Sequence, residues 1–215
     1  MKQTFVTLLF FAIFFTSTFG QKYGKDEINF SDPFQIDSSE YFLIPKLIDN
    51  FNQQAYGKGK GYIPFGNYSD INFYNLKTNI NKKLFDGQLA SIEPFYSRRF
   101  YYDNDKEKNI PVNILSKHIV YLVRIDDFGG DNAIDTDDPL YLYISTKSGD
   151  SLKRITPKGF HVVSWTLSRD KKMILVKGQS DKNGNKKFGN GDDELFYRID
   201  LDDDISKIQC SLINL

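Results

Sequence analysis

The sequence predicts an all-β fold, and three observations lead to this class. Short runs rich in β-branched and aromatic residues recur along the chain, separated by clusters of glycine, asparagine and aspartate, which is the pattern of strands and turns. Aromatic residues make up 15% of the chain, and such side chains favour half-buried strands. No segment keeps a helical 3.6-residue period for three turns. The clearest expected strands lie at 41–44, 118–123, 140–144, 160–165, 173–176 and 195–199.

The N-terminus precedes these strands and has the layout of a secretory signal. Residues 1–20 begin with Lys2, continue through the apolar stretch Phe5–Phe15 and end in small and polar residues. This stretch is shorter than the ~20 apolar residues that a spanning helix needs, and no later segment reaches that length. We therefore expect an exported, periplasmic or extracellular protein, with one domain over 21–215 and no membrane span in the mature chain. An uncleaved N-terminal anchor is the alternative.

Composition limits the partners and the chemistry. The 28 basic and 28 acidic residues give a net charge of zero, which argues against nucleic acid or an anionic membrane as the main partner. Cys210 is the only cysteine, so an intrachain disulfide is excluded. His118 and His161 lie in strand-like segments without the context of a nucleophilic serine or cysteine. We identify no catalytic residues, and a non-enzymatic role is favoured.

One hairpin pattern occurs three times along the chain. Its anchoring tyrosines, Tyr74, Tyr143 and Tyr197, lie 69 and 54 residues apart, which is the period of a propeller blade with one long insertion. Four strands per repeat place the blades at about 28–86, 87–157 and 158–212. The predicted fold is therefore three four-stranded antiparallel blade-like sheets, a partial or open β-propeller. Closed propellers have about four to eight blades, so we expect an open arc, self-association or completion by a protein partner.

Two segments carry a resemblance to a known family. Residues 154–157 read Arg-Ile-Thr-Pro, and residues 164–175 read Ser-Trp-Thr-Leu-Ser-Arg-Asp-Lys-Lys-Met-Ile-Leu. This resembles the TolB-type β-propeller repeat, whose blades end in Leu-Thr-Pro and continue with Trp-Ser-Pro-Asp-Gly-Lys. Arg169 stands in place of the proline and Lys171 in place of the glycine. The resemblance covers about 118–212 and implies a secreted bacterial propeller protein.

Trp165 lies in the segment that carries this resemblance. Val163, Trp165 and Leu167 alternate along one expected strand, so their side chains should share one face of the sheet. We expect Trp165 to be buried there, between two adjacent sheets.

The connection between the strands at 118–125 and 140–144 is acidic. Six carboxylates lie within residues 126–138, and they repel one another strongly unless a cation sits among them. With Asp127 as position 1, oxygen-bearing side chains fall at positions 1, 5, 9 and 12, which is similar to the EF-hand calcium loop. The predicted calcium ligands are Asp127, Asp131, Asp135 and Asp138.

The equivalent connection at 181–193 repeats this design with the predicted ligands Asp181, Asn183, Asn185 and Asp192. Because they connect equivalent strands, both loops should lie at one edge of the molecule. Position 6, a glycine in EF-hands, is Asn132 in one loop and Lys186 in the other, and lysine tolerates the left-handed conformation less well. The second loop is expected to be one residue longer, which would leave Asp193 or Glu194 to close it. Solvated acidic turns are the alternative to calcium.

Three functions remain open at this stage. The leading hypothesis is an exported, non-enzymatic binding module stabilised by calcium. Since TolB-type propellers often accompany peptidases, the resemblance also implies a hydrolase or a peptidase-associated accessory domain. The third is a structural half-propeller that a partner completes.

Overall fold

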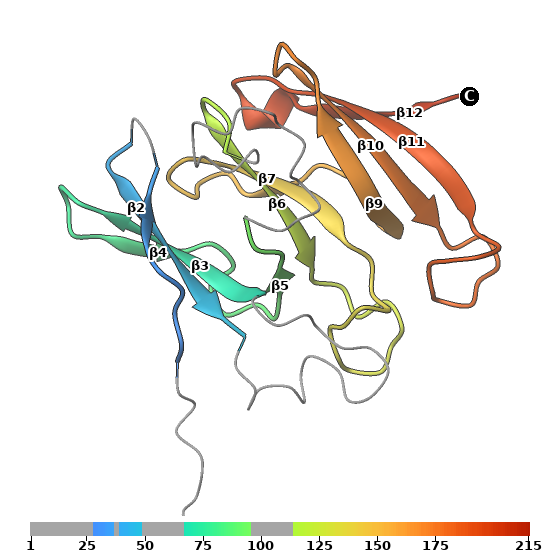
Figure 1. The fold of residues 1–215 in the computed structure, drawn as a ribbon, viewed down its shortest axis with the longest axis horizontal. Coiled ribbons are helices and arrows are strands. Elements are labelled where there is room, and N and C mark those ends of the chain that lie inside the picture. The colour runs from blue at the N-terminus through green and yellow to red at the C-terminus, as the bar shows by residue number, and fades with distance from the viewer. Residues whose placement is uncertain (1–27, 37–38, 49–66, 96–113) are drawn as a thin grey trace, which may run out of the picture.

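The computed structural model describes residues 28–36, 39–48, 67–95 and 114–215 (Figure 1). The expected signal at 1–20 lies outside these residues. The all-β class is confirmed, because within the described ranges the only helix is one 3-10 turn, η3 (Ile205–Lys207). None of the described segments forms a helix long and apolar enough to cross a bilayer.

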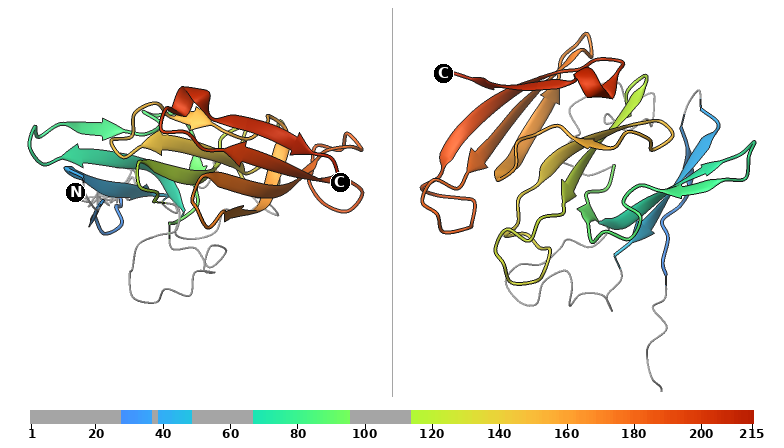
Figure 2. Two further views of the ribbon diagram at one scale, coloured as in Figure 1. Left: turned by 90° about the horizontal axis from the view of Figure 1, so that it is seen from above. Right: turned by 180° about the vertical axis from the view of Figure 1, so that it is seen from behind.

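The strands form three consecutive four-stranded antiparallel units, and Figures 1 and 2 show them in chain order from one side of the molecule to the other. Unit one contains β1 (Phe34–Gln35), β2 (Tyr41–Leu47), β3 (Tyr68–Asn75) and β4 (Asn81–Lys83). Unit two contains β5 (Ser91–Ile92), β6 (His118–Arg124), β7 (Tyr141–Thr146) and β8 (Lys153–Arg154). Unit three contains β9 (Phe160–Leu167), β10 (Met173–Ser180), β11 (Asp193–Asp200) and β12 (Gln209–Ile213).

Units one and two share one sheet, which differs from the three separate sheets expected. Strand β4 pairs with only the C-terminal half of β3, so the other end of the same edge remains open. Tyr68 of β3 pairs there with Ile92 of β5, and this pair joins the units into an eight-stranded sheet. Unit three is a separate four-stranded sheet, and neither sheet closes on itself.

Strand β6 lies between two hydrophobic cores, and all of its residues are buried. Because side chains of a strand alternate between its faces, Ile119, Tyr121 and Val123 enter the core shared with unit one. Val120 and Leu122 enter the core shared with unit three. The partners on these two sides are Leu43, Ile71 and Phe73 from unit one and Val162, Ile174 and Val176 from unit three.

A β-bulge in β9 changes which residues face the core. Val162 pairs with Gly178 and Ser164 with Lys177, so Val163 is the extra residue of the bulge. Val162 is therefore buried and Val163 is 41% exposed. Beyond the bulge Trp165 packs against the core between units two and three, as expected, but it is only partly buried, so the expected burial of Trp165 is met only in part.

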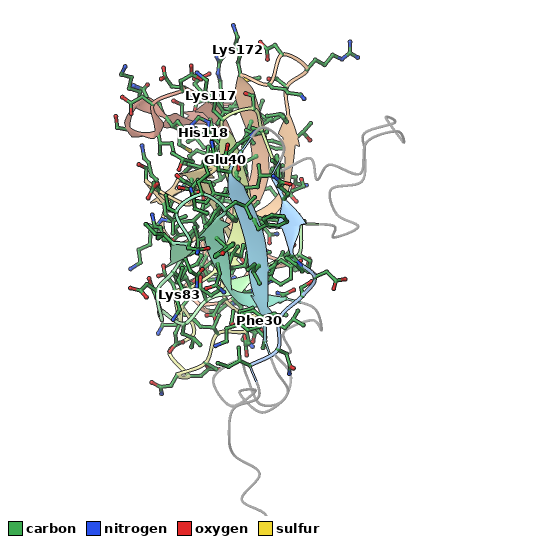
Figure 3. The ribbon with its side chains drawn as sticks, turned by 90° about the vertical axis from the view of Figure 1, so that its left-hand side faces the viewer. Phe30, Glu40, Lys83, Lys117, His118 and Lys172 are labelled. Carbon is green, nitrogen blue, oxygen red and sulfur yellow. The ribbon has the colours of Figure 1, made fainter. Side chains whose placement is uncertain are left out.

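Units two and three are also held together by polar contacts. The N–H of Val162 in β9 donates to the carbonyl of Leu140, just before β7, at 2.9 Å. At the other end of the units, Lys117 forms an ion pair with Asp203, and His118 Nε2 lies 3.3 Å from the carbonyl oxygen of Asp203. Lys117 and His118 are labelled at this end in Figure 3.

We predict that Gly178→Ala strongly destabilises the protein. A Cβ at this position would lie 2.2 Å from the carbonyl oxygen of His161 and 2.3 Å from a ring carbon of Phe160, so the backbone at the bulge would have to move. We expect a loss of about 3 kcal/mol or more in the free energy of unfolding, measured by denaturant titration. Gly189→Ala is the matched control, because no atom lies within 4 Å of its Cβ position, and it should change stability by less than about 0.5 kcal/mol. Equal effects of the two variants would contradict the close contact.

Candidate functional site

Two acidic loops leave the sheets at one edge of the molecule, as their equivalent connections predict. Loop one (Asp127–Asp138) joins β6 to β7, and loop two (Asp181–Asp192) joins β10 to β11. Both lie towards the lower edge in Figure 1. Their side chains meet, because Lys187 Nζ lies 3.1 Å from Asp137 Oδ2 and the rings of Phe128 and Phe188 are 5.2 Å apart.

The first turn of loop one folds around the carboxylate of Asp127. Its Oδ1 accepts hydrogen bonds from the N–H groups of Gly130 at 2.6 Å and Asp131 at 3.1 Å, and its Oδ2 accepts from Asn132 at 2.8 Å. Gly130 and Asn132 have positive φ angles of 79° and 64°, which direct these N–H groups inward. The Asp127 carboxylate thus satisfies three consecutive backbone donors.

The end of loop one folds in the same way around Asp138. Its Oδ1 accepts from the N–H groups of Phe128 at 2.8 Å and Gly129 at 3.4 Å, and its Oδ2 accepts from Asp135 at 2.9 Å. Asp138 therefore ties the beginning of the loop to its end.

Two carboxylates of loop one are withdrawn from solvent. Asp135 is 6% exposed and Asp138 is 3% exposed. Burial raises the pKa of both carboxyl groups, and the backbone N–H groups that donate to them oppose this rise. A cation near either group would favour the charged form.

Loop two repeats the first turn of loop one at a distance of 54 positions. Asp181 Oδ1 accepts from the N–H groups of Gly184 at 2.7 Å and Asn185 at 3.1 Å, and Oδ2 accepts from Lys186 at 2.9 Å. Lys186 has a φ of 59°, so this lysine adopts the left-handed conformation that position 6 requires. Asn132 occupies the same position in loop one.

The end of loop two shows that it has the same length as loop one, which corrects the expectation of an extra residue. Asp192 Oδ1 accepts from the N–H of Lys182 at 3.2 Å, and Oδ2 accepts from Gly189 at 2.9 Å. Asp192 therefore takes the place of Asp138. Asp193 instead forms an ion pair with Lys182 at 2.8 Å.

The remaining predicted ligands also make hydrogen bonds within their own loops. Asp131 Oδ1 accepts from the N–H of Ala133 at 3.0 Å, and Asn185 Oδ1 accepts from Lys187 at 2.8 Å, so these two positions are again equivalent. Asn183 donates from Nδ2 to Asp192 at 3.1 Å. In the described part of the chain, no three His, Cys, Asp or Glu side chains converge as a preformed metal cage.

Sequence reasoning missed the way in which loop two supplies cations to loop one. Besides the ion pair of Lys187 with Asp137, the Nζ of Lys186 lies against Gly130, 3.6 Å from where a Cβ would stand. Lys187 of loop two thus partly neutralises Asp137 of loop one, and Lys186 brings a second ammonium group near the backbone of loop one. Because the Lys187–Asp137 pair is exposed, its contribution to stability is small, about 1 kcal/mol or less.

His161 connects the loops to the sheets. Its Nδ1 lies 3.2 Å from the N–H of Leu140, which assigns Nδ1 as the acceptor, and its ring stacks on Phe188 at 5.2 Å. The residue therefore joins β9, the start of β7 and loop two. These contacts give His161 a structural role at the junction of the loops and the sheets.

No protein-family model matches the chain, and no curated protein sequence matches it.

We predict that Asp127→Ala and Asp181→Ala destabilise the protein to a similar extent. Each variant removes a carboxylate that accepts from three backbone N–H groups, as at a helix N-cap, so we expect a loss of about 1 to 2 kcal/mol in denaturant titration. Asp131→Asn keeps the Oδ1 acceptor and serves as the control, with a change below about 0.5 kcal/mol. The folding role of position 1 is refuted if both alanine variants are as stable as the control.

Proposed function

We propose that the chain is an exported, non-enzymatic interaction module built as a partial TolB-type propeller. Its binding edge is the pair formed by loops one and two, and calcium is the ligand of this edge. The observation that carries the proposal is the duplicated loop geometry, in which two loops share length, backbone conformation and hydrogen-bond pattern at equivalent places. Such repetition at one edge favours a common binding role over two unrelated surface turns.

The donor set of the loops suits a hard cation. Calcium takes six to eight oxygen ligands from carboxylates, amides, carbonyls and water, and the EF-hand loop needs a sharp turn at position 6. Asn132 and Lys186 supply that turn through their positive φ angles. Loop one would hold calcium through Asp127, Asp131, Asp135 and Asp138, and loop two through Asp181, Asn183, Asn185 and Asp192. Bound calcium would screen the carboxylates and stiffen the edge.

The positions of the lysines favour loop one as the stronger of the two proposed calcium sites. Loop one combines six carboxylates at 126–138 with the exposed ion pair to Lys187. Loop two contains three lysines, Lys182, Lys186 and Lys187, which repel a divalent ion. We therefore assign the stronger site to loop one, with Lys187 as a competing cation.

A role in protein interaction is supported by the outer face of unit three. This face carries Val163 and Leu175, which are 41% and 40% exposed. It also carries Lys177, which pairs with Ser164 of β9. In unit two the corresponding sheet is covered on both sides. A protein partner that covers this face would complete the stack, as the third hypothesis from the sequence requires.

Calcium titration of the mature exported protein tests the proposal. We expect millimolar calcium to raise the melting temperature relative to chelator, with a stabilisation of about 1 to 2 kcal/mol at ten times Kd. Asp131→Ala should remove most of this response, because it takes one ligand from loop one without removing the carboxylates that close the turns.

Two lysine variants give the matched control. Lys187→Ala removes the cation beside Asp137 and should increase calcium affinity, measured by calorimetry, by a few-fold. Lys182→Ala removes an exposed lysine that pairs with Asp193 and should increase it less. Calcium has no role at this edge if neither the melting temperature nor the calorimetric signal changes in the wild type or in Lys187→Ala.

A further inference from the structure

The C-terminal strand β12 is an exposed edge of the four-stranded sheet. Among the described strands it pairs only with β11. Residues 209–212 are exposed, and Ile213 is half-buried. The outer side of this five-residue strand therefore presents backbone donors and acceptors to solvent.

Other edge strands of the described chain are protected, whereas β12 is not. Strands β4 and β8 carry lysine or arginine, β1 has two residues, and β9 bonds through Val162 to Leu140. Natural proteins protect sheet edges with charge, proline, short length or cover, because a bare edge pairs with other chains. The sequence of β12, Gln-Cys-Ser-Leu-Ile, contains neither a charged residue nor proline. This composition is typical of a strand that pairs with a neighbouring strand on both of its edges.

The hydrogen-bond pattern of the sheet identifies the outward groups of β12. The N–H of Leu201 donates to the carbonyl of Lys172 at 2.8 Å, and bonded pairs alternate along antiparallel strands. Every second residue of β11 before Leu201 therefore bonds to β10, and the residues between them, such as Arg198, bond to β12. Arg198 pairs with Ser211, so the backbone groups of Ser211 face β11. Those of Cys210 and Leu212 therefore point away from the sheet.

We propose that β12 pairs antiparallel with β12 of a second copy of this chain, about a two-fold axis at Ser211. This is the register that pairs all five residues of the strand. The backbone of Cys210 would exchange both hydrogen bonds with Leu212 of the second copy, and Ser211 would face Ser211. The two four-stranded sheets would then form one continuous sheet of eight strands.

The side chains of β12 fit a second copy. Because the strand carries no charge, two-fold pairing brings no like charges together. Leu212 lies across from Tyr197 of β11 and so projects on the core side, yet it is 48% exposed. In the proposed pair it would lie beside Cys210 of the second copy, which extends the apolar layer over the junction. This inference is independent of calcium and of the two loops.

A cysteine placed on the two-fold axis tests the pairing. Ser211→Cys in a Cys210→Ser background would put two cysteines in a non-hydrogen-bonded pair, with Cα atoms about 4.5 Å apart, within reach of a disulfide. We expect mild oxidation of the mature protein, with chelator present, to convert most of it to a covalent dimer on a non-reducing gel. Gln209→Cys in the same background is the control. It would face Ile213, leaving the two cysteines about 13 Å apart, and should remain monomeric.

A backbone variant provides the second measurement. Leu212→Pro removes an outward N–H and leaves the bonds between β12 and β11 in place. It should convert a dimeric mass in light scattering to a monomeric one with little change in melting temperature. The proposal is overturned by a monomeric wild type or by equal cross-linking of both cysteine variants. It is also overturned if β12 instead captures an extended peptide from another protein.

Discussion

Strand β6 must bury both of its faces, and the arrangement of the other elements depends on this requirement. Its odd-numbered side chains from Ile119 to Val123 need an apolar surface on one side, which unit one provides. Val120 and Leu122 need another on the opposite side, which unit three provides. Unit two alone would expose one or both of these faces to water, so its stability depends on its neighbours. The outer units lack a similar constraint, and their outer faces can carry mixed side chains.

The loop edge follows from the same stacking. Equivalent connections of stacked sheets emerge together, so the ends of β6 and β10 bring loops one and two into contact. Each loop is shaped by aspartates that accept backbone N–H groups within the loop. Charge is then balanced between the loops by Lys187 and Asp137. The edge thus combines carboxylates held by backbone N–H groups with a lysine beside them, and under the proposed function calcium would compete with Lys187 for loop one.

Periodicity and turn residues were sufficient to predict the strand class, the hairpins and the shared position of the two loops, because these depend on local patterns. The bulge at Val163 could not be predicted, since it arises from pairing with Gly178, and it removes Val163 from the core face that Trp165 and Leu167 keep. Likewise, the contact of Lys187 with Asp137 joins residues 50 positions apart and depends on how the units stack. The sequence also led us to expect that Lys186 would tolerate the left-handed conformation poorly. Backbone propensity does not include the hydrogen bond from the N–H of Lys186 to Asp181, which stabilises this conformation.

The constant offset of 54 positions between loops one and two has a consequence for how their charges meet. The two loops have equal length, matching first and last aspartates and the same hydrogen bonds at position 1, so they are structural repeats. The two loops differ in charge, because loop one is anionic and loop two carries three lysines. They are therefore not interchangeable: two copies of loop one side by side would repel each other, and so would two copies of loop two. A repeat of one backbone geometry with unequal charges therefore gives a complementary pair.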